Sequence, residues 1–376
     1  MLTSRLKKLL LNRDQEEAEK FISRLHRDNS WSAISFIDEM LPLLLFQSNL
    51  KYGNFHQVKM ALQLRHLLRS GKLSRPTQRA VMKLLIEEGL RESRINVEAG
   101  EIALAEKKED PLSSMLEELS HHSLHNAFYY ALQAYEENPD KLLDLLLSLG
   151  GVYGPENLGH SLSCFFPVIE EIVSSNHPVS KTALFSYILY LGRYDIPADF
   201  TPQDYKMEDM PDNALRLAAS GEDIVNLHHM ITLATYRLWE QADFHNDDFP
   251  LPYRIFFQKR LKGKEVSKEQ LARVKKPISV DMPKSYENFR EDFSYDDVEH
   301  TTSLVRRVWQ EAPEEAWDWV FRLYAEDYRP QTWNPHFYTG IYLAFRLDEE
   351  GLVQDRLAAE MAVDQAVAYY VKSLSS

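Results

Sequence analysis

The chain has 376 residues, with 43 Lys and Arg against 57 Asp and Glu, which gives a formal net charge of −14. With 44% hydrophobic and 27% charged residues it can bury a sizeable core, which excludes a disordered acidic segment. Its single cysteine, Cys164, excludes a disulfide framework and any zinc site with two or more thiolates, and the acidic balance argues against nucleic acid or an anionic membrane as the main partner.

The N-terminal region predicts an amphipathic helix and not a targeting or membrane segment. Its apolar run is limited to Leu9–Leu11, whereas a secretory signal needs about 7–15 apolar residues. The apolar stretch 40–46 contains Pro42 and is far shorter than the roughly 18 residues that span a bilayer. Together with the single cysteine, this predicts a soluble cytoplasmic protein, and it leaves the oligomeric state open.

Helical periodicity dominates the chain. Proline at a first turn (Pro139, Pro178) and glycine at an end (Gly71, Gly150, Gly192) mark the boundaries. In chain order, helices are predicted at 60–68, 139–149, 178–191, 222–242, 313–327, 335–348 and 351–374. Alternating strand patterns with Asn-Gly or Asp-Gly turns do not occur. We therefore predict an all-α fold in a single domain, 1–376.

The segment 244–297 differs from the rest and is predicted to be an irregular excursion or lid within that domain. Its part 254–276 carries nine Lys or Arg against two Glu in an otherwise acidic chain. One interpretation is a solvated helix that crosses the surface. The other is a lid whose basic patch attracts a phosphate group, such as the 2′-phosphate of NADPH.

Histidines recur at the starts of apolar, aromatic-rich helices. The five positions are His56, His125, His160, His229 and His336, and they are separated by 69, 35, 69 and 107 residues, close to multiples of 35. A helical hairpin with two short turns occupies about that length. We therefore expect an array of antiparallel hairpins, curved or closed around a central cavity into which the histidines point.

Four of these histidines follow an asparagine by two or three residues, and an asparagine at a helix start is typical of an N-cap. Helix stability gives no comparable reason for histidine. The positive end of the helix dipole disfavours imidazolium, and neutral imidazole is the form that binds a metal or donates a hydrogen bond to a carbonyl group.

Two further groups could bind a metal. His121, His122 and His125 have the spacing of one helical face, but no H-E-x-x-H signature accompanies them. His245 precedes Asp247 and Asp248, a pattern that an Asx turn before a proline also explains. The chain has no G-x-G-x-x-G fingerprint for a flavin or nicotinamide domain after a strand, and no G-x-S-x-G nucleophile elbow.

The stretches YGNFHQVKMALQL, SLHNAFYYALQAYEENPDKLLDLL, GHSLSCFFPVIEEI and LHHMITLATYRL resemble the histidine-headed helices of the questin oxidase family. The resemblance extends over residues 52–345. It implies a helical enzyme that uses NADPH and oxygen to open or hydroxylate polycyclic aromatic ketones, without a classical flavin domain. Carried onto this chain, the recurring motif falls on the five histidines named above. The segment 254–276 has no counterpart in the family pattern.

The leading hypothesis is therefore a monooxygenase-like oxidoreductase with a small, apolar, oxygenated ring compound as substrate. Its five motif histidines would be catalytic by polarising a carbonyl or accepting a phenolic proton. Substrate contacts are predicted for Asn54, His122, Asn126, Asn157, Asn226, His228, Asn334, Tyr129, Phe165 and Tyr236. Two alternatives stay open: a metal-dependent oxygenase whose metal is held by the same five histidines, and a non-enzymatic helical-repeat scaffold that binds proteins.

Overall fold

The computed structural model describes residues 2–27, 32–45, 56–91, 106–152, 158–196, 213–245, 251–328, 334–353 and 355–374. Within these ranges the regular structure is helical and no strand is present, so the all-α prediction is confirmed. The helices are α1 (Leu2–Asn12), α2 (Gln15–Arg27), α3 (Ala33–Leu44), α4 (His56–Arg69), α5 (Arg75–Arg91), α6 (Pro111–Ser120), α7 (Leu124–Glu137), α8 (Pro139–Val152), α10 (His160–Ser163), α11 (Phe166–Val168), the π-helix η1 (Ile169–Val173), α12 (Ser180–Leu191), α13 (Ala214–Ala218), α14 (Ile224–Trp239), α15 (Leu251–Leu261), α16 (Lys268–Lys275), α17 (Tyr286–Asp292), α18 (Val298–Glu311), α19 (Pro313–Glu326), α20 (Pro335–Glu349) and α21 (Arg356–Leu374). None of the helices in the described ranges is long and apolar enough to cross a membrane.

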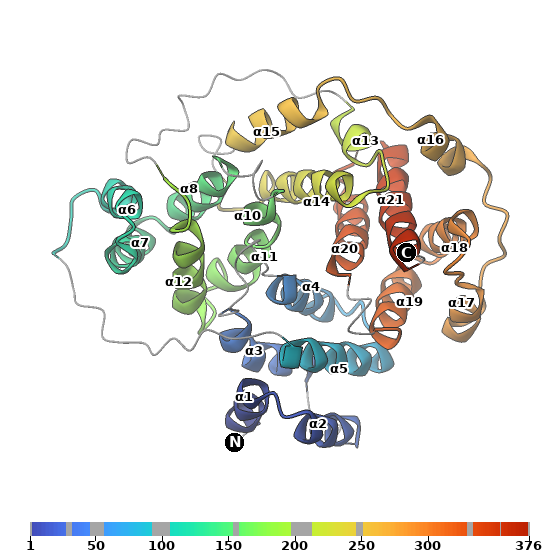
Figure 1. The fold of residues 1–376 in the computed structure, drawn as a ribbon, viewed down its shortest axis with the longest axis horizontal. Coiled ribbons are helices and arrows are strands. Elements are labelled where there is room, and N and C mark those ends of the chain that lie inside the picture. The colour runs from blue at the N-terminus through green and yellow to red at the C-terminus, as the bar shows by residue number, and fades with distance from the viewer. Residues whose placement is uncertain are drawn as a thin grey trace.

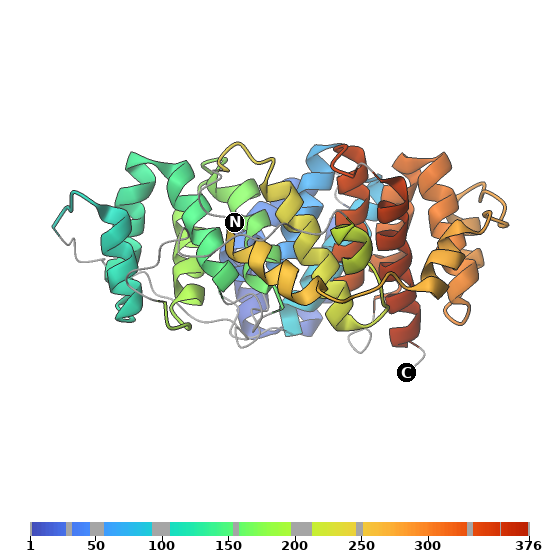
Figure 2. The ribbon, with the colours of Figure 1, turned by 90° about the horizontal axis from the view of Figure 1, so that it is seen from above.

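The helices form a flat, curved array. Many of them run across its thin dimension, as the two perpendicular views show (Figures 1 and 2). Consecutive helices pack on one another, as in the pairs α6–α7, α18–α19 and α20–α21. In Figure 1, α4, α10, α14 and α20 surround the middle of the array. The N-terminal ends of these four helices provide the site described below.

Two predicted boundaries are instructive. Gly192 is the C-cap of α12, as expected. Helix α8, in contrast, continues through Gly150 and Gly151 to Val152. A Cβ at Gly150 would lie 2.7 Å from the Cβ of Ser161, and one at Gly151 would lie 2.7 Å from the ring of Tyr253. These glycines therefore serve close helix packing and not helix termination.

The segment 244–297 is more regular than predicted, because its described part contains α15, α16 and α17. Helix α15 packs on α8 and α14, and α16 packs on α21 along the outside of the array (Figure 1). Several of its basic side chains have acidic partners on other helices, such as Arg254 with Glu240 at 3.2 Å. Lid movement and phosphate attraction stay predictions for this segment.

Two adjacent glutamates of η1 hold the far ends of α4 and α20. Glu170 accepts hydrogen bonds from the guanidinium of Arg346 on α20, at 2.5 and 2.9 Å. Glu171 accepts a bond of 2.8 Å from Arg65 on α4, and Asp38 binds the same guanidinium at 2.8 Å. The π-helix η1 follows α10 and α11 directly. Pro167 lies in α11 and prevents these short segments from forming one continuous α-helix. This glutamate pair thus ties together three of the segments that bring histidines to the centre.

Candidate functional site: a four-histidine centre

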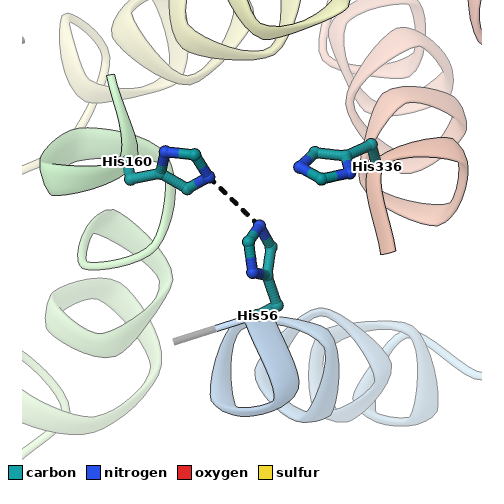
Figure 3. A group of neighbouring side chains, drawn as sticks. All are labelled: His56, His160 and His336. Carbon is teal, nitrogen blue, oxygen red and sulfur yellow. Dashed lines mark hydrogen bonds between the residues drawn. The ribbon is translucent and has the colours of Figure 1, made fainter. Parts of the chain in front are cut away.

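Four histidines from four helices meet at the centre of the array. His56 is the first residue of α4, His160 is the first of α10, and His336 is the second of α20. Their rings point toward one another (Figure 3). His228, the fifth residue of α14, completes the group, with its ring centroid 4.7 Å from that of His160 and 4.4 Å from that of His336. We call these four residues the four-histidine centre.

Three of the four histidines, His56, His160 and His336, have ring nitrogens close enough to share an ion. The Nε2 atom of His160 lies 3.1 Å from Nε2 of His56 and 3.2 Å from Nε2 of His228. One ring nitrogen from each of His56, His160 and His336 lies within 4.8 Å of the other two. Nitrogens in a tetrahedral zinc site, with bonds of about 2.0–2.1 Å, are separated by about 3.4 Å, so the three rings would have to close in around the ion.

Hydrogen bonding alone does not explain this convergence. Nδ1 of His228 lies 2.6 Å from the carbonyl oxygen of Ile224, which can only accept, so Nδ1 carries the proton and Nε2 has a free lone pair. Nε2 of His160 faces two other Nε2 atoms, yet it has at most one proton to donate. Nε2 of His336 is buried without a hydrogen-bond partner in the described structure. A metal ion held by His56, His160 and His336 would take up lone pairs of these three rings.

Burial keeps three of the four imidazoles, those of His56, His228 and His336, neutral near pH 7. Burial lowers the pKa of His56 and His336 well below 6.5, and the positive charge of nearby Lys59 acts in the same direction. Burial also lowers the pKa of His228 to about 4. Imidazoles that stay neutral near pH 7 are competent metal ligands and hydrogen-bond partners.

Local sequence places each ring. Asn334 is the N-cap of α20 and accepts a 3.3 Å bond from the backbone N–H of Phe337, as predicted for the asparagines. The corresponding prediction for Asn226 is wrong. Asp223 caps α14, and Asn226 lies one turn inside the helix, where its side chain bonds Asp223 and Lys264. Asn54 and Asn157 lie outside the described residues.

The short helix α10 begins after two residues with left-handed backbone. Leu158 has φ +54° and Gly159 has φ +77°. A Cβ at residue 159 would overlap the side chain of Thr232 on α14. Glycine therefore lets α10 approach α14 closely, which brings His160 next to His228.

Replacement of Gly159 by Ala should therefore destabilise the protein by more than about 2 kcal/mol, since left-handed strain is added to the overlap with Thr232. Gly71→Ala is the matched control. Gly71 has φ +71° but no atom within 4 Å of an added Cβ, so only the conformational cost of about 1–2 kcal/mol applies. Urea unfolding would measure both, and equal losses would contradict the packing role of Gly159.

Two of the five motif histidines are not part of the centre. His125 is exposed on α7, and its ring lies 6.2 Å from that of Phe185 on α12. His229 follows His228 on α14 and faces a different way, with its ring 6.0 Å from Phe256 of α15. Both ring nitrogens of His229 are buried without hydrogen-bond partners in the described ranges, and burial lowers its pKa to about 4. Of the five histidines expected to converge, three do so: His56, His160 and His336. The fourth member of the centre is His228, which the sequence analysis named as a substrate contact.

The other predicted substrate contacts lie in two places. His122 and Asn126 are on the α6–α7 pair at the edge of the array, where Nδ1 of His122 lies 3.0 Å from Gly192 O and Asn126 donates to Glu118. The aromatic residues pack on core neighbours: Tyr129 on Tyr130, Phe165 on Tyr187, and Tyr236 on Phe257. Their predicted substrate contacts stay untested. Two further metal-ligand groups were predicted. The first, His121, His122 and His125, does not form a metal-ligand cluster with any described residues. In the second, Asp247 and Asp248 lie outside the described ranges.

Sequence reasoning did not single out Lys59, which is 1% exposed. It lies three residues after His56 and therefore on the same side of α4. A lysine between the apolar residues Val58 and Met60 was the available signal.

No protein-family model, curated protein or solved structure matches the chain.

Proposed function

We propose that the protein is an oxidoreductase whose reactive centre is the four-histidine centre, loaded with a transition-metal ion. The observation that carries the proposal is the convergence of four imidazoles from four helices, with Nε2 separations of 3.1 and 3.2 Å. An all-nitrogen ligand set of this kind suits iron, copper or zinc. It supports the metal-dependent form of the hypothesis more than one in which histidines act alone.

The chain's own residues would divide the work. His56, His160 and His336 would hold the ion, and the Ile224 carbonyl keeps Nε2 of His228 unprotonated and directed into the centre. Three histidine ligands would leave coordination positions on the ion open. A neutral imidazole beside those positions can accept a proton from a phenolic substrate. When bound, a redox-active ion would supply the activation of oxygen that histidine cannot provide.

Substrate class and reductant rest on the resemblance of the histidine-headed helices to the questin oxidase family. The proposed substrate is an apolar, oxygenated ring compound of the polycyclic ketone type, and the proposed reductant is NADPH. The basic segment 254–276 is where we expect the nucleotide phosphate. Phe337 and Tyr338 follow His336 directly, and their rings pack on Tyr370 and Phe321 in the core.

The test is oxygen uptake with NADPH and a panel of polycyclic aromatic ketones, using protein loaded in turn with iron, copper and zinc. We expect turnover with one redox-active metal. The double variant His160→Gln, His228→Gln should lose it by more than about 100-fold while keeping its circular dichroism spectrum, because it lacks two imidazoles of the centre.

His125→Gln is the matched control, since this exposed histidine belongs to the same sequence motif but lies outside the centre. It should keep wild-type turnover. The proposal would be rejected if the double variant kept full activity, or if no metal form consumed oxygen with any ketone of the panel.

A further inference from the structure

His229 is a buried histidine that lies outside the four-histidine centre. It is 4% exposed, and neither of its ring nitrogens has a hydrogen-bond partner in the part of the chain that the structure describes. In either neutral tautomer, one of these nitrogens carries a proton and the other a lone pair. A buried donor without an acceptor destabilises a fold, and an apolar side chain at this position would avoid that cost. Packing alone therefore gives no reason for a histidine here.

A lysine with only neutral hydrogen-bond partners lies on the same side of α14. Nζ of Lys264 donates to Oδ1 of Asn226 and, at 3.4 Å, to the carbonyl oxygen of Leu217. Asn226 precedes His229 by three residues, so the two side chains occupy neighbouring positions on one face of the helix. Among the described residues, no carboxylate forms an ion pair with Lys264, and two hydrogen bonds leave one of its three protons to donate.

Helix α15 adds a second cation. The ring of Phe256 lies 6.0 Å from that of His229, and Cζ of Arg260 lies 5.8 Å from the centroid of the same Phe256 ring. Burial has the largest effect on the pKa of His229, and the positive charges of Lys264 and Arg260 lower it further. Both cations are therefore close enough to act on the same bound group as the imidazole.

We call His229, Arg260 and Lys264 the His229 cluster. Asp223 is a carboxylate whose negative charge also reaches His229, with a smaller effect than that of either cation. Its side chain is the N-cap of α14 and accepts hydrogen bonds from the backbone N–H groups of Val225 and Asn226. The cluster therefore keeps an excess of positive charge beside a buried imidazole that has no partner in the described structure.

We propose that the His229 cluster binds the phosphate group of a small ligand. Lys264 and Arg260 would neutralise its charge, and the imidazole N–H of His229 would donate to one of its oxygens. Phosphate suits this set of donors because it offers three strong acceptor oxygens and a charge of up to about −2. The Phe256 side chain would turn aside to admit the ligand, because both nitrogens of His229 are buried. The inference rests on the proposed function only for the source of the phosphate, which would be NADPH.

The experiment measures the binding of inorganic phosphate to the full chain, without added metal, by isothermal titration calorimetry at constant ionic strength. We expect saturable binding at one site. His229→Leu and Lys264→Met should each weaken it at least about tenfold, because each removes a donor to the phosphate oxygens. Lys181→Met is the matched control, since it removes an exposed positive charge from α12, outside the cluster, and should leave the affinity unchanged.

Urea unfolding without phosphate separates binding from folding. His229→Leu should be at least as stable as the wild type there, because it removes a buried polar group that lacks a partner in the described ranges. Phosphate should raise the urea midpoint of the wild type and not that of this variant. The absence of saturable phosphate binding, or wild-type affinity in both variants, would overturn the proposal.

Competition with nucleotides identifies the source of the phosphate. Displacement by NADPH and not by NADH assigns the site to the nucleotide 2′-phosphate, whereas phosphate that resists both nucleotides assigns it to another phosphorylated ligand; both results support the His229 cluster. The binding measurement needs neither metal nor turnover. Phosphate binding in a chain that takes up no metal would therefore leave this site standing alone, and metal binding without phosphate binding would leave the four-histidine centre alone.

Discussion

Protein purified from metal-supplemented medium is expected to carry about one transition-metal ion per chain, and the double variant His56→Gln, His336→Gln should carry none. These two histidines come from α4 and α20 and supply two of the three nitrogens that lie within 4.8 Å of one another. Their loss leaves too few ligands for a stable site, so affinity should fall by more than about 100-fold. Elemental analysis after gel filtration measures the content, and competition with a chelator measures the affinity.

The controls for this prediction are His125→Gln and His229→Gln. His125 is exposed on α7, and His229 is buried but directed toward Phe256 of α15. Both variants should bind metal as the wild type does. Metal retained by the double variant would place the ion elsewhere, and a wild-type chain that binds no metal under any loading condition would remove the metal centre altogether.

Replacement of Glu171 by Gln should destabilise the folded protein by about 3 kcal/mol at pH 7. Its side chain is 5% exposed and binds Arg65, with His66 and Arg69 also in contact. Burial alone would raise the pKa of Glu171, but hydrogen bonds from His66 and Arg65 outweigh it and lower the pKa from 4.5 to about 2. Gln cannot carry the charge that these cations require, so the α4 end of the glutamate pair is weakened.

The sign of the pH dependence follows from that lowered pKa. The stabilising contribution is complete above pH 4.5 and is lost as the pH falls toward 2, where the folded protein also takes up the proton. The stability difference between wild type and variant should therefore shrink over this interval in urea titrations. Glu314→Gln is the control, since this 66% exposed partner of Lys72 should contribute less than about 1 kcal/mol. A loss at Glu171 no larger than at Glu314 would contradict the predicted role.

Much of the architecture was predictable because helix signals are local. The predicted helices at 313–327 and 335–348 match α19 and α20 almost residue for residue, since Pro313 and Pro335 begin them. The convergence of His56, His160 and His336 also followed from a local rule, that helix starts which share a motif lie on one side of an array.

The remainder of the site depends on packing. His228 and His229 are adjacent, and only the start of α14 at Asp223 decides which of them faces the centre. His125 shares the motif, but α7 packs on α6 at the edge of the array. The ion pairs of Glu170 and Glu171 join residues more than a hundred positions apart, and the burial of Lys59 is a property of its surroundings. No pattern in one chain reveals these relations.

The four-histidine centre joins residues that are 280 positions apart, from His56 to His336. Such a centre has high contact order: it forms only when the last helices of the chain have docked on the first. An ion bound there would favour the completed fold over every partly folded state by mass action. Metal binding would then distinguish complete chains from incomplete ones, because a chain whose synthesis stops before α20 lacks His336 as a ligand.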